Sequence, residues 1–261
     1  MKIIAVLIVI IDHIGFYLWR YFSYENYYIL RTIGRIAMPV FTYLIVQGFF
    51  YTKDLKKYIS RMFAFAIITQ IVLITIDNIN NIVYPGINYY PNVKLLGILF
   101  SYAFTLIVLA VIDRRIWNSK LNKFQNIIIN VFLTVFLVFA YIMLNIEYGV
   151  RIPVIAVLVY GIEKLFMKNN QLLKKQDDVS VVKKVLYLIM ILAVLAFSLV
   201  FLKNSPGNKY GVLFAVILIA LYNGEKGRDN KFVQYLFYAI FPIQHTAKLG
   251  VESPKYFSCC S

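Results

Sequence analysis

The run IIINVFLTVFLVFAYIML at residues 127–144 decides the class of fold, because its 18 residues include no charged side chain. A second run of the same length and character, VLYLIMILAVLAFSLVFL, occupies residues 185–202. About 18 to 20 apolar residues in a helix cross the roughly 30 Å hydrocarbon core of a bilayer. Backbone polar groups in lipid must be satisfied within their own segment, so these runs are expected to be helices.

The rest of the chain has the same character, since 61% of its 261 residues are hydrophobic and 15% are charged. An ordinary soluble domain has fewer apolar and more charged residues. We therefore predict an all-α, polytopic integral membrane helical bundle with about 8 full transmembrane helices and a short ninth apolar helix. The full spans are predicted at residues 3–19, 27–50, 59–76, 95–112, 127–144, 150–165, 185–202 and 210–222, and the short helix at residues 232–243.

The basic residues indicate how the bundle is oriented. With the N-terminus in the cytoplasm, 18 lysines and arginines fall in cytoplasmic segments and five fall on the opposite side. The positive-inside rule therefore favours a cytoplasmic N-terminus. The net charge of +15 is spread over short loops instead of one basic arm, so we expect the lipid bilayer as a partner and no nucleic acid.

Four ionisable residues lie inside the first two predicted spans, where an unpartnered charge costs several kcal/mol. Asp12 and His13 belong to span 3–19, and Arg31 and Arg35 belong to span 27–50. If the second span runs inward, Arg35 lies about 12 Å and His13 about 9 Å from the same outer surface. The arginines are four residues apart, which places them on one helix face. We expect the four side chains to meet in one polar site.

Two interpretations of this site remain open. The first is a structural salt bridge that pairs two helices. The second is catalytic, because a histidine beside a carboxylate has its tautomer and basicity set by that partner, as in general bases. The presence of His13 favours the catalytic interpretation for that residue. Asp12 and His13 inside the first span, with no cleavage site, also favour a retained helix over a signal peptide.

Other polar residues near span ends have simpler explanations. Glu147, Tyr148 and Arg151 border a short outer loop, and Glu163 lies near the inner end of span 150–165. We expect these side chains to be solvated or to snorkel to the surface. The chain has no GxSxG elbow, Walker loop, HExxH motif or other metal-ligand cluster. We therefore expect no bound metal, and the sequence argues against a serine hydrolase, a nucleoside triphosphatase or a metalloprotease.

Several short motifs together resemble the TraX family, which includes a conjugal-transfer protein that acetylates the N-terminus of pilin. IDHIG at residues 11–15, LRTIGR at 30–35, MPVFTYLIVQGFF at 38–50 and KKYISR at 56–61 carry the resemblance. Further matches follow in the family's order: ILFSYAFTL at 98–106, EYGV at 147–150, YNGEKG at 222–227 and FYAIFP at 237–242. The resemblance covers residues 1–243, which we predict to be one TraX-like membrane acyltransferase domain.

The TraX family is in turn similar to the larger acyltransferase-3 class, in which a first-span histidine is functional. This resemblance implies a multi-pass protein of the bacterial cytoplasmic membrane that transfers an acyl group, with acetyl-CoA as donor. It implies His13 as general base, Asp12 as the group that orients it, and Arg35 or Arg31 as the group that holds Asp12 or stabilises the oxyanion. The basic side chains implied to attract the phosphates of coenzyme A are Lys53, Lys56, Lys57 and Arg61.

The C-terminal end departs from the family pattern. The family ends with YPxH and a further apolar helix, whereas this chain has Phe241-Pro242-Ile243-Gln244, and His245 comes one place late. Residues 244–261 are polar, and we expect them to form a divergent tail outside the membrane domain.

Three functions fit these residues. The first is acetyl transfer to an amine or hydroxyl of a pilin or cell-surface glycan. The second is a transporter in which Asp12, His13 and the arginines relay protons or bind an anion. The third is a noncatalytic component of pilus or secretion assembly. The cytoplasmic cluster of Lys53, Lys56, Lys57 and Arg61 is also explained by the positive-inside rule alone.

Reporter fusions test the predicted orientation. Because of the charge distribution, fusions after Lys57, Lys120, Lys175 and Lys226 should report a cytoplasmic position, and one near Asn88 an external position. Paired alkaline phosphatase and fluorescent-protein fusions at each site provide the measurement. Two or more reversed sites would contradict the assigned spans.

Overall fold

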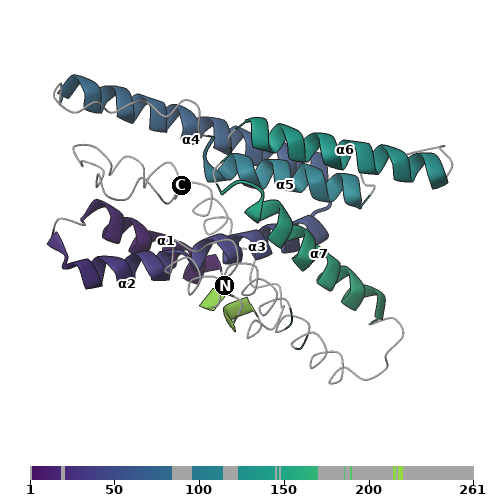
Figure 1. Cartoon of the computed structure of the whole chain (residues 1–261), viewed down its shortest axis with the longest axis horizontal. Coiled ribbons are helices and arrows are strands. Elements are labelled where there is room, and N and C mark those ends of the chain that lie inside the picture. The colour runs from purple at the N-terminus through teal and green to yellow at the C-terminus, as the bar shows by residue number, and fades with distance from the viewer. Residues whose placement is uncertain are drawn as a thin grey trace. The chain divides into compact units, whose positions relative to one another are not determined.

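The computed structural model of the chain describes residues 2–18, 21–83, 96–113, 123–144, 146 and 148–169, with isolated positions at 185, 189, 214, 215 and 217–219. These residues form seven helices and no strand (Figure 1), and a lone parallel bridge joins Leu96 to Ile146. The helices are α1 (Lys2–Tyr17), α2 (Tyr24–Gly34), α3 (Ala37–Tyr51), α4 (Leu55–Val83), α5 (Ile98–Ile112), α6 (Lys123–Met143) and α7 (Arg151–Asn169). The predicted all-α class is confirmed within this part of the chain.

The six predicted spans between residues 3 and 165 each overlap one or two of these helices. The spans predicted at 185–202, 210–222 and 232–243, like the tail at 244–261, lie outside the described residues except for the isolated positions above, which are helical. Two of the described helices, taken as Tyr24–Tyr51 and Leu55–Ile76, are long and apolar enough to cross a membrane, and three shorter apolar helices accompany them. The total of eight spans and a short ninth stays a prediction.

The second predicted span, residues 27–50, consists of α2 and α3, which together form the candidate membrane span Tyr24–Tyr51. Arg35 and Ile36 form a turn between α2 and α3. Pro39 explains the position of this turn, because proline has no N–H to donate to the carbonyl of Arg35 four residues earlier. The Arg35 N–H still donates to the Arg31 carbonyl at 3.1 Å, so α2 ends with a regular turn.

The chain divides into two compact units. The first contains Met1–Leu44 and Leu158–Ala247, and the second contains Ile45–Val157. In the first unit α1 packs against α2 as a hairpin. In the second unit α4 packs against α5, and α5 against α6. Helices α3 and α7 each contribute residues to both units.

Aromatic rings and one side-chain cap fix the packing of α4 on α5. Phe63 of α4 meets Phe100 and Phe104 edge-on, with ring centroids 6.3 and 5.5 Å away. Gln70 of α4 accepts a hydrogen bond from the backbone N–H of Gly97, the N-cap of α5, at 3.2 Å. This bond satisfies a helix-end donor that would otherwise lie unpaired in apolar surroundings.

Helices α3 and α4 approach each other closely at Gly48. A Cβ at this position would lie 2.7 Å from the hydroxyl oxygen of Tyr58, which is a buried residue of α4. Because Gly48 has no side chain, the phenol of Tyr58 can lie against the α3 backbone. Small residues allow the same close approach between helices in membranes.

Gly48→Ala should destabilise the protein by about 1–3 kcal/mol, because the added methyl overlaps the phenol. Adding Tyr58→Phe to that variant should restore part of the loss, since it removes the nearest atom. Thermal unfolding in detergent measures both. A Gly48→Ala protein that melts at the parent temperature would contradict this packing.

Candidate functional site

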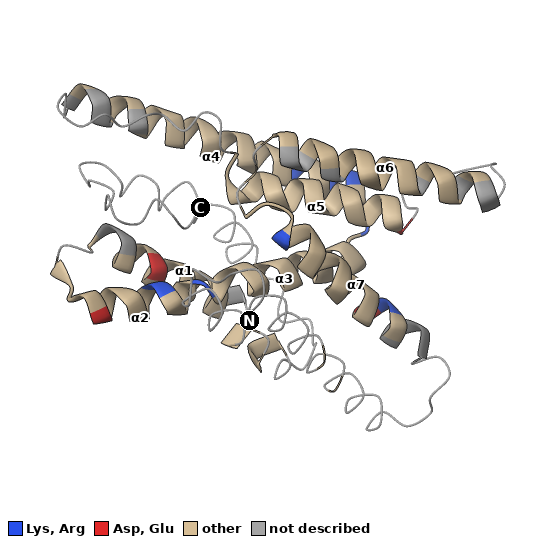
Figure 2. Cartoon of the chain, in the orientation of Figure 1, with Lys and Arg blue, Asp and Glu red and all other residues tan. Residues whose placement is uncertain are grey.

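Helix α1 begins at Lys2, is apolar from Ile3 to Ile11, and carries Asp12 and His13 near its C-terminal end. Large side chains such as Ile3, Leu7, Ile10 and Ile14 form an exposed stripe, as expected of a face in contact with lipid. Asp12 and His13 are only 18% and 22% exposed. Figure 2 shows acidic and basic positions facing each other across α1 and α2.

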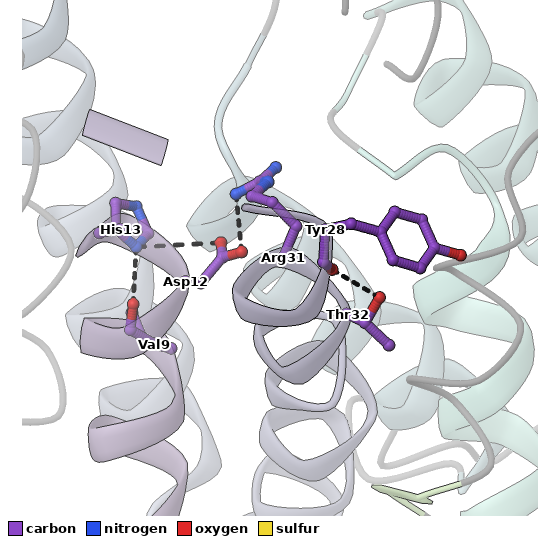
Figure 3. A network of polar contacts seen from close by, with 6 residues as sticks. All are labelled: Val9, Asp12, His13, Tyr28, Arg31 and Thr32. Atoms are coloured by element: carbon purple, nitrogen blue, oxygen red, sulfur yellow. Dashed lines mark hydrogen bonds and ion pairs between the residues drawn. The ribbon is translucent and has the colours of Figure 1, made fainter. Parts of the chain in front are cut away.

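The central contact of the site is an ion pair between Asp12 of α1 and Arg31 of α2. The Nη1 atom of Arg31 donates to Oδ1 of Asp12 at 2.6 Å, and the Arg31 side chain is 20% exposed (Figure 3). A hydrogen bond of this length between charged groups is stronger than one between neutral groups. The apolar surroundings also screen the attraction between the two charges less than water would. The pair therefore joins the two helices of the hairpin, as predicted for one of the two arginines.

The backbone, and not Asp12, orients the His13 ring. Its Nδ1 atom lies 2.8 Å from the carbonyl oxygen of Val9, one turn earlier, and 4.0 Å from Oδ2 of Asp12 (Figure 3). A distance of 4.0 Å is too long for a hydrogen bond. We expected Asp12 to orient the ring; in this geometry the Val9 carbonyl does so, and Asp12 contributes its charge.

This geometry also assigns the tautomer of His13. A carbonyl oxygen can only accept, so Nδ1 carries the proton that it donates to Val9. The neutral ring then has its lone pair on Nε2. A histidine held in this way has the electronic arrangement of a general base, with one nitrogen fixed by a backbone acceptor and the other able to take a proton.

Glycines let α1 and α2 approach closely at the ion pair. A Cβ built on Gly34 would overlap the Asp12 side chain, and one built on Gly15 would lie 2.7 Å from Cβ of Leu30. Gly34 comes three residues after Arg31, so both are on the same face of α2. Gly34 was not among the residues predicted for the site. The available signal was a small residue on the helix face that carries Arg31.

Arg35 lies one turn beyond Arg31, at the C-cap of α2, and is half-buried. The structure thus brings Asp12, His13 and Arg31 into contact and places Arg35 next to them along the helix. All four belong to the first compact unit.

The basic cluster of Lys53, Lys56, Lys57 and Arg61 lies at the start of α4, in the second unit. Its three lysines are exposed. Asp54 begins the helix, because its Oδ1 atom accepts from the Lys57 N–H at 2.9 Å. The Nε atom of Arg61 donates to the Lys57 carbonyl at 3.3 Å.

Positive charge at a helix N-terminus is opposed by the helix dipole, so the cluster does not serve to stabilise α4. Its charge is available to solvent anions or to a negatively charged lipid surface.

The expectation of solvated side chains near the span ends is wrong for Glu163. This residue of α7 is 4% exposed. Its neighbour Lys164 is exposed, and its Nζ atom donates to the Tyr160 hydroxyl at 2.5 Å. Arg151 is exposed as expected, and Glu147 lies outside the described residues. Among the residues that the structure describes, no three His, Cys, Asp or Glu side chains gather as metal ligands.

The family described as TraX protein matches residues 1–245 of this chain. The chain belongs to the TraX family. The match covers the hairpin that carries Asp12, His13, Arg31 and Arg35 as well as the basic cluster. Membership, together with the apolar helices, indicates a membrane protein, and the predicted resemblance to TraX is confirmed.

Curated relatives of this TraX family member match over short stretches. The probable fimbrial assembly protein FimC, serogroup H1, of Dichelobacter nodosus is 31% identical over 75 residues, 27% of this chain and 28% of that protein. An uncharacterised protein of Rickettsia prowazekii (strain Madrid E) is 41% identical over 71 residues, 27% of this chain and 25% of that protein. The chain therefore spans about a quarter of the length of these relatives. No solved structure matches.

Gly34→Ala should destabilise the protein by about 1–3 kcal/mol, because its methyl group would displace the Asp12 side chain from Arg31. Gly161→Ala in α7 is the matched control, since a Cβ there meets no atom within 4 Å. That change should be neutral or stabilise by up to about 1 kcal/mol through helix propensity. Equal melting temperatures for the two variants would contradict the close approach at Gly34.

Proposed function

We propose that this TraX family protein is a membrane-bound acyltransferase that moves an acetyl group from acetyl-CoA to an amine or hydroxyl. The observation that carries the proposal is the 2.8 Å contact between Nδ1 of His13 and the Val9 carbonyl oxygen. We infer from it that the neutral ring has its lone pair on Nε2. A base of this kind is what an amine or hydroxyl needs in order to attack a thioester. The proposed kinship with the acyltransferase-3 class rests on the place of His13 in the first helix.

The proposed acetyl transfer has two steps. The acceptor nitrogen or oxygen attacks the thioester carbonyl while Nε2 of His13 takes the acceptor's proton. The tetrahedral oxyanion then collapses, the carbon–sulfur bond breaks, and the sulfur of coenzyme A leaves with the proton that His13 returns. The products are the acetylated acceptor and free coenzyme A.

Asp12 and the arginines have electrostatic roles in this mechanism. The Asp12 carboxylate, 4.0 Å from the ring, stabilises the imidazolium that forms when His13 takes a proton. The contact with Arg31 holds that carboxylate in place. Arg35 or Arg31 supplies positive charge for the oxyanion, an effect worth up to about 4 kcal/mol in other acyl transfers.

The exposed cluster of Lys53, Lys56, Lys57 and Arg61 is the proposed binding surface for the phosphates of acetyl-CoA. Exposed lysines attract anions through long-range charge, so this contribution should weaken as salt is added. The acceptor is proposed to be a pilin or a cell-surface glycan, and the protein is proposed to lie in the bacterial cytoplasmic membrane with its N-terminus inside.

A noncatalytic role in pilus assembly is the second candidate, and the match to a fimbrial assembly protein favours it. In that case the Asp12–Arg31 pair would serve only to hold α1 against α2. The two candidates differ in whether the purified protein turns over acetyl-CoA.

His13→Ala should lower acetyl transfer about 10²- to 10⁴-fold, because the general base is lost. His13→Gln should lose a similar share of the rate, since its amide can donate to the Val9 carbonyl but is not a base. Ile14→Ala, on the exposed face of α1, is the matched control and should keep the parent rate. Labelled acetyl-CoA with amine and hydroxyl acceptors, and the purified protein in lipid nanodiscs, provide the measurement.

Folding must be monitored alongside the rate. A purely structural His13 would show its loss in melting temperature and yield, and a catalytic one in turnover. Parent-level transfer by well-folded His13→Ala would refute the catalytic assignment. Absence of turnover by the parent with every acceptor tried would favour the assembly role.

A further inference from the structure

Helix α4 has one continuous exposed face over residues 55–71. Its buried side chains recur every three or four residues and pack into the second unit, and they include Tyr58, Met62, Ala66 and Thr69. Its exposed side chains recur with the same period on the opposite side, within about a third of the helix circumference. The exposed face includes Lys56, Lys57, Ser60, Ala64, Ile67 and Ile71.

The first part of this face is basic. Lys53 just precedes the helix and Lys56 and Lys57 lie in its first turn, and all three side chains are exposed. Arg61, half-buried one turn later, adds a further positive charge. Asp54 is the single acidic residue from position 51 to 76, and its carboxylate accepts the Lys57 N–H. An anion beside these lysines would be stabilised both by their charge and by the helix dipole.

The part that follows is first small and then apolar. Ser60 and Ala64 are exposed and carry little side-chain volume. Ile67 and Ile71 are each exposed over about half of their surface. Ile67 comes ten residues after Lys57, about 15 Å along the helix axis, which is half of the roughly 30 Å hydrocarbon core. The apolar part of the face therefore extends over the depth of one lipid leaflet.

Tyr51 indicates where the membrane surface lies at the basic end. It is the last residue of α3, two positions before Lys53, and its side chain is exposed. Exposed tyrosines are common at the level of lipid headgroups. The predicted orientation puts this end on the cytoplasmic side, where anionic lipids give the leaflet a negative surface potential. Both arguments place the lysines at the level of the lipid phosphates.

We propose that this face of α4 binds an anionic phospholipid, with the headgroup phosphate at the three lysines and an acyl chain along the face from Ser60 to Ile71. A zwitterionic lipid carries its own cation, so it gains less from the lysines. A water-soluble phosphate meets the lysines but leaves the isoleucines unused. The inference goes beyond the proposed acyl transfer and does not depend on it. Where both hold, the lipid and coenzyme A compete for the same lysines.

Lipid binding to the full chain in detergent tests the proposal. Phosphatidylglycerol and phosphatidylcholine with the same acyl chains are titrated, and bound lipid is counted by native mass spectrometry. Phosphatidylglycerol should bind at least about tenfold more tightly, and added salt should reduce the preference because exposed charges are screened. Glycerol phosphate, which has no acyl chain, should bind at least about tenfold more weakly than phosphatidylglycerol. Equal affinity for the two lipids, or for lipid and glycerol phosphate, would overturn the inference.

Two double variants that each remove two exposed basic side chains separate this site from general charge. Lys56→Gln/Lys57→Gln should weaken binding of phosphatidylglycerol about 20-fold, at about fivefold for each lysine, and leave phosphatidylcholine within about twofold. Arg151→Gln/Lys164→Gln, on α7, is the matched control and should bind both lipids within about twofold of the parent. Melting temperatures show whether both variants are folded. Equal losses in the two variants would mean that only total charge matters, and would contradict the proposed site.

Photolabelling of the parent protein tests the position of the acyl chain without any variant. The probe is phosphatidylglycerol with a photoreactive group in the distal half of one acyl chain, used as a trace component of phosphatidylcholine nanodiscs. Cross-links should map to residues 64–71 and should decrease when unlabelled phosphatidylglycerol replaces part of the phosphatidylcholine. Cross-links that leave residues 64–71 unlabelled, or that unlabelled phosphatidylglycerol does not reduce, would refute the binding of an anionic lipid to this face.

Discussion

The ion pair of Asp12 and Arg31 is the interaction on which the first compact unit depends. Either charge alone inside an apolar hairpin would cost several kcal/mol, so neither helix has a favourable place in a membrane without the other. At 2.6 Å the pair neutralises both charges and fixes the level at which α1 meets α2. The same contact defines the hairpin and supplies the charged part of the proposed site.

Three features of the sequence make that contact possible. Gly34 and Gly15 remove the side chains that would keep the helices apart. Pro39 accounts for the turn at Arg35 and Ile36 that separates α2 from α3, one helical turn after Arg31. These are constraints of volume and backbone hydrogen bonding, and they operate independently of any catalytic role.

A structural pair and a catalytic site are compatible in this hairpin. The Val9 carbonyl fixes His13, and Asp12 is left to engage Arg31, so one carboxylate can hold two helices together and still act on the ring at 4.0 Å. Membership of the TraX family and the likeness to a fimbrial assembly protein agree with either acetyl transfer or assembly. Turnover of acetyl-CoA by the purified protein would separate the two.

The sequence by itself determined the helical class, the approximate place of each described helix, and the candidate set of Asp12, His13, Arg31 and Arg35. Long apolar runs, and the charges within them, can be identified from the local sequence alone. Because an unpaired charge in lipid is costly, each such charge is expected to have a partner nearby. Only the tertiary structure decided that Arg31 pairs with Asp12, that Val9 orients His13, that Gly34 borders the pair, and that Glu163 is buried. These facts depend on how each helix is rotated about its axis and how closely it approaches its neighbour, and apolar runs without a strong polar face leave that rotation undetermined.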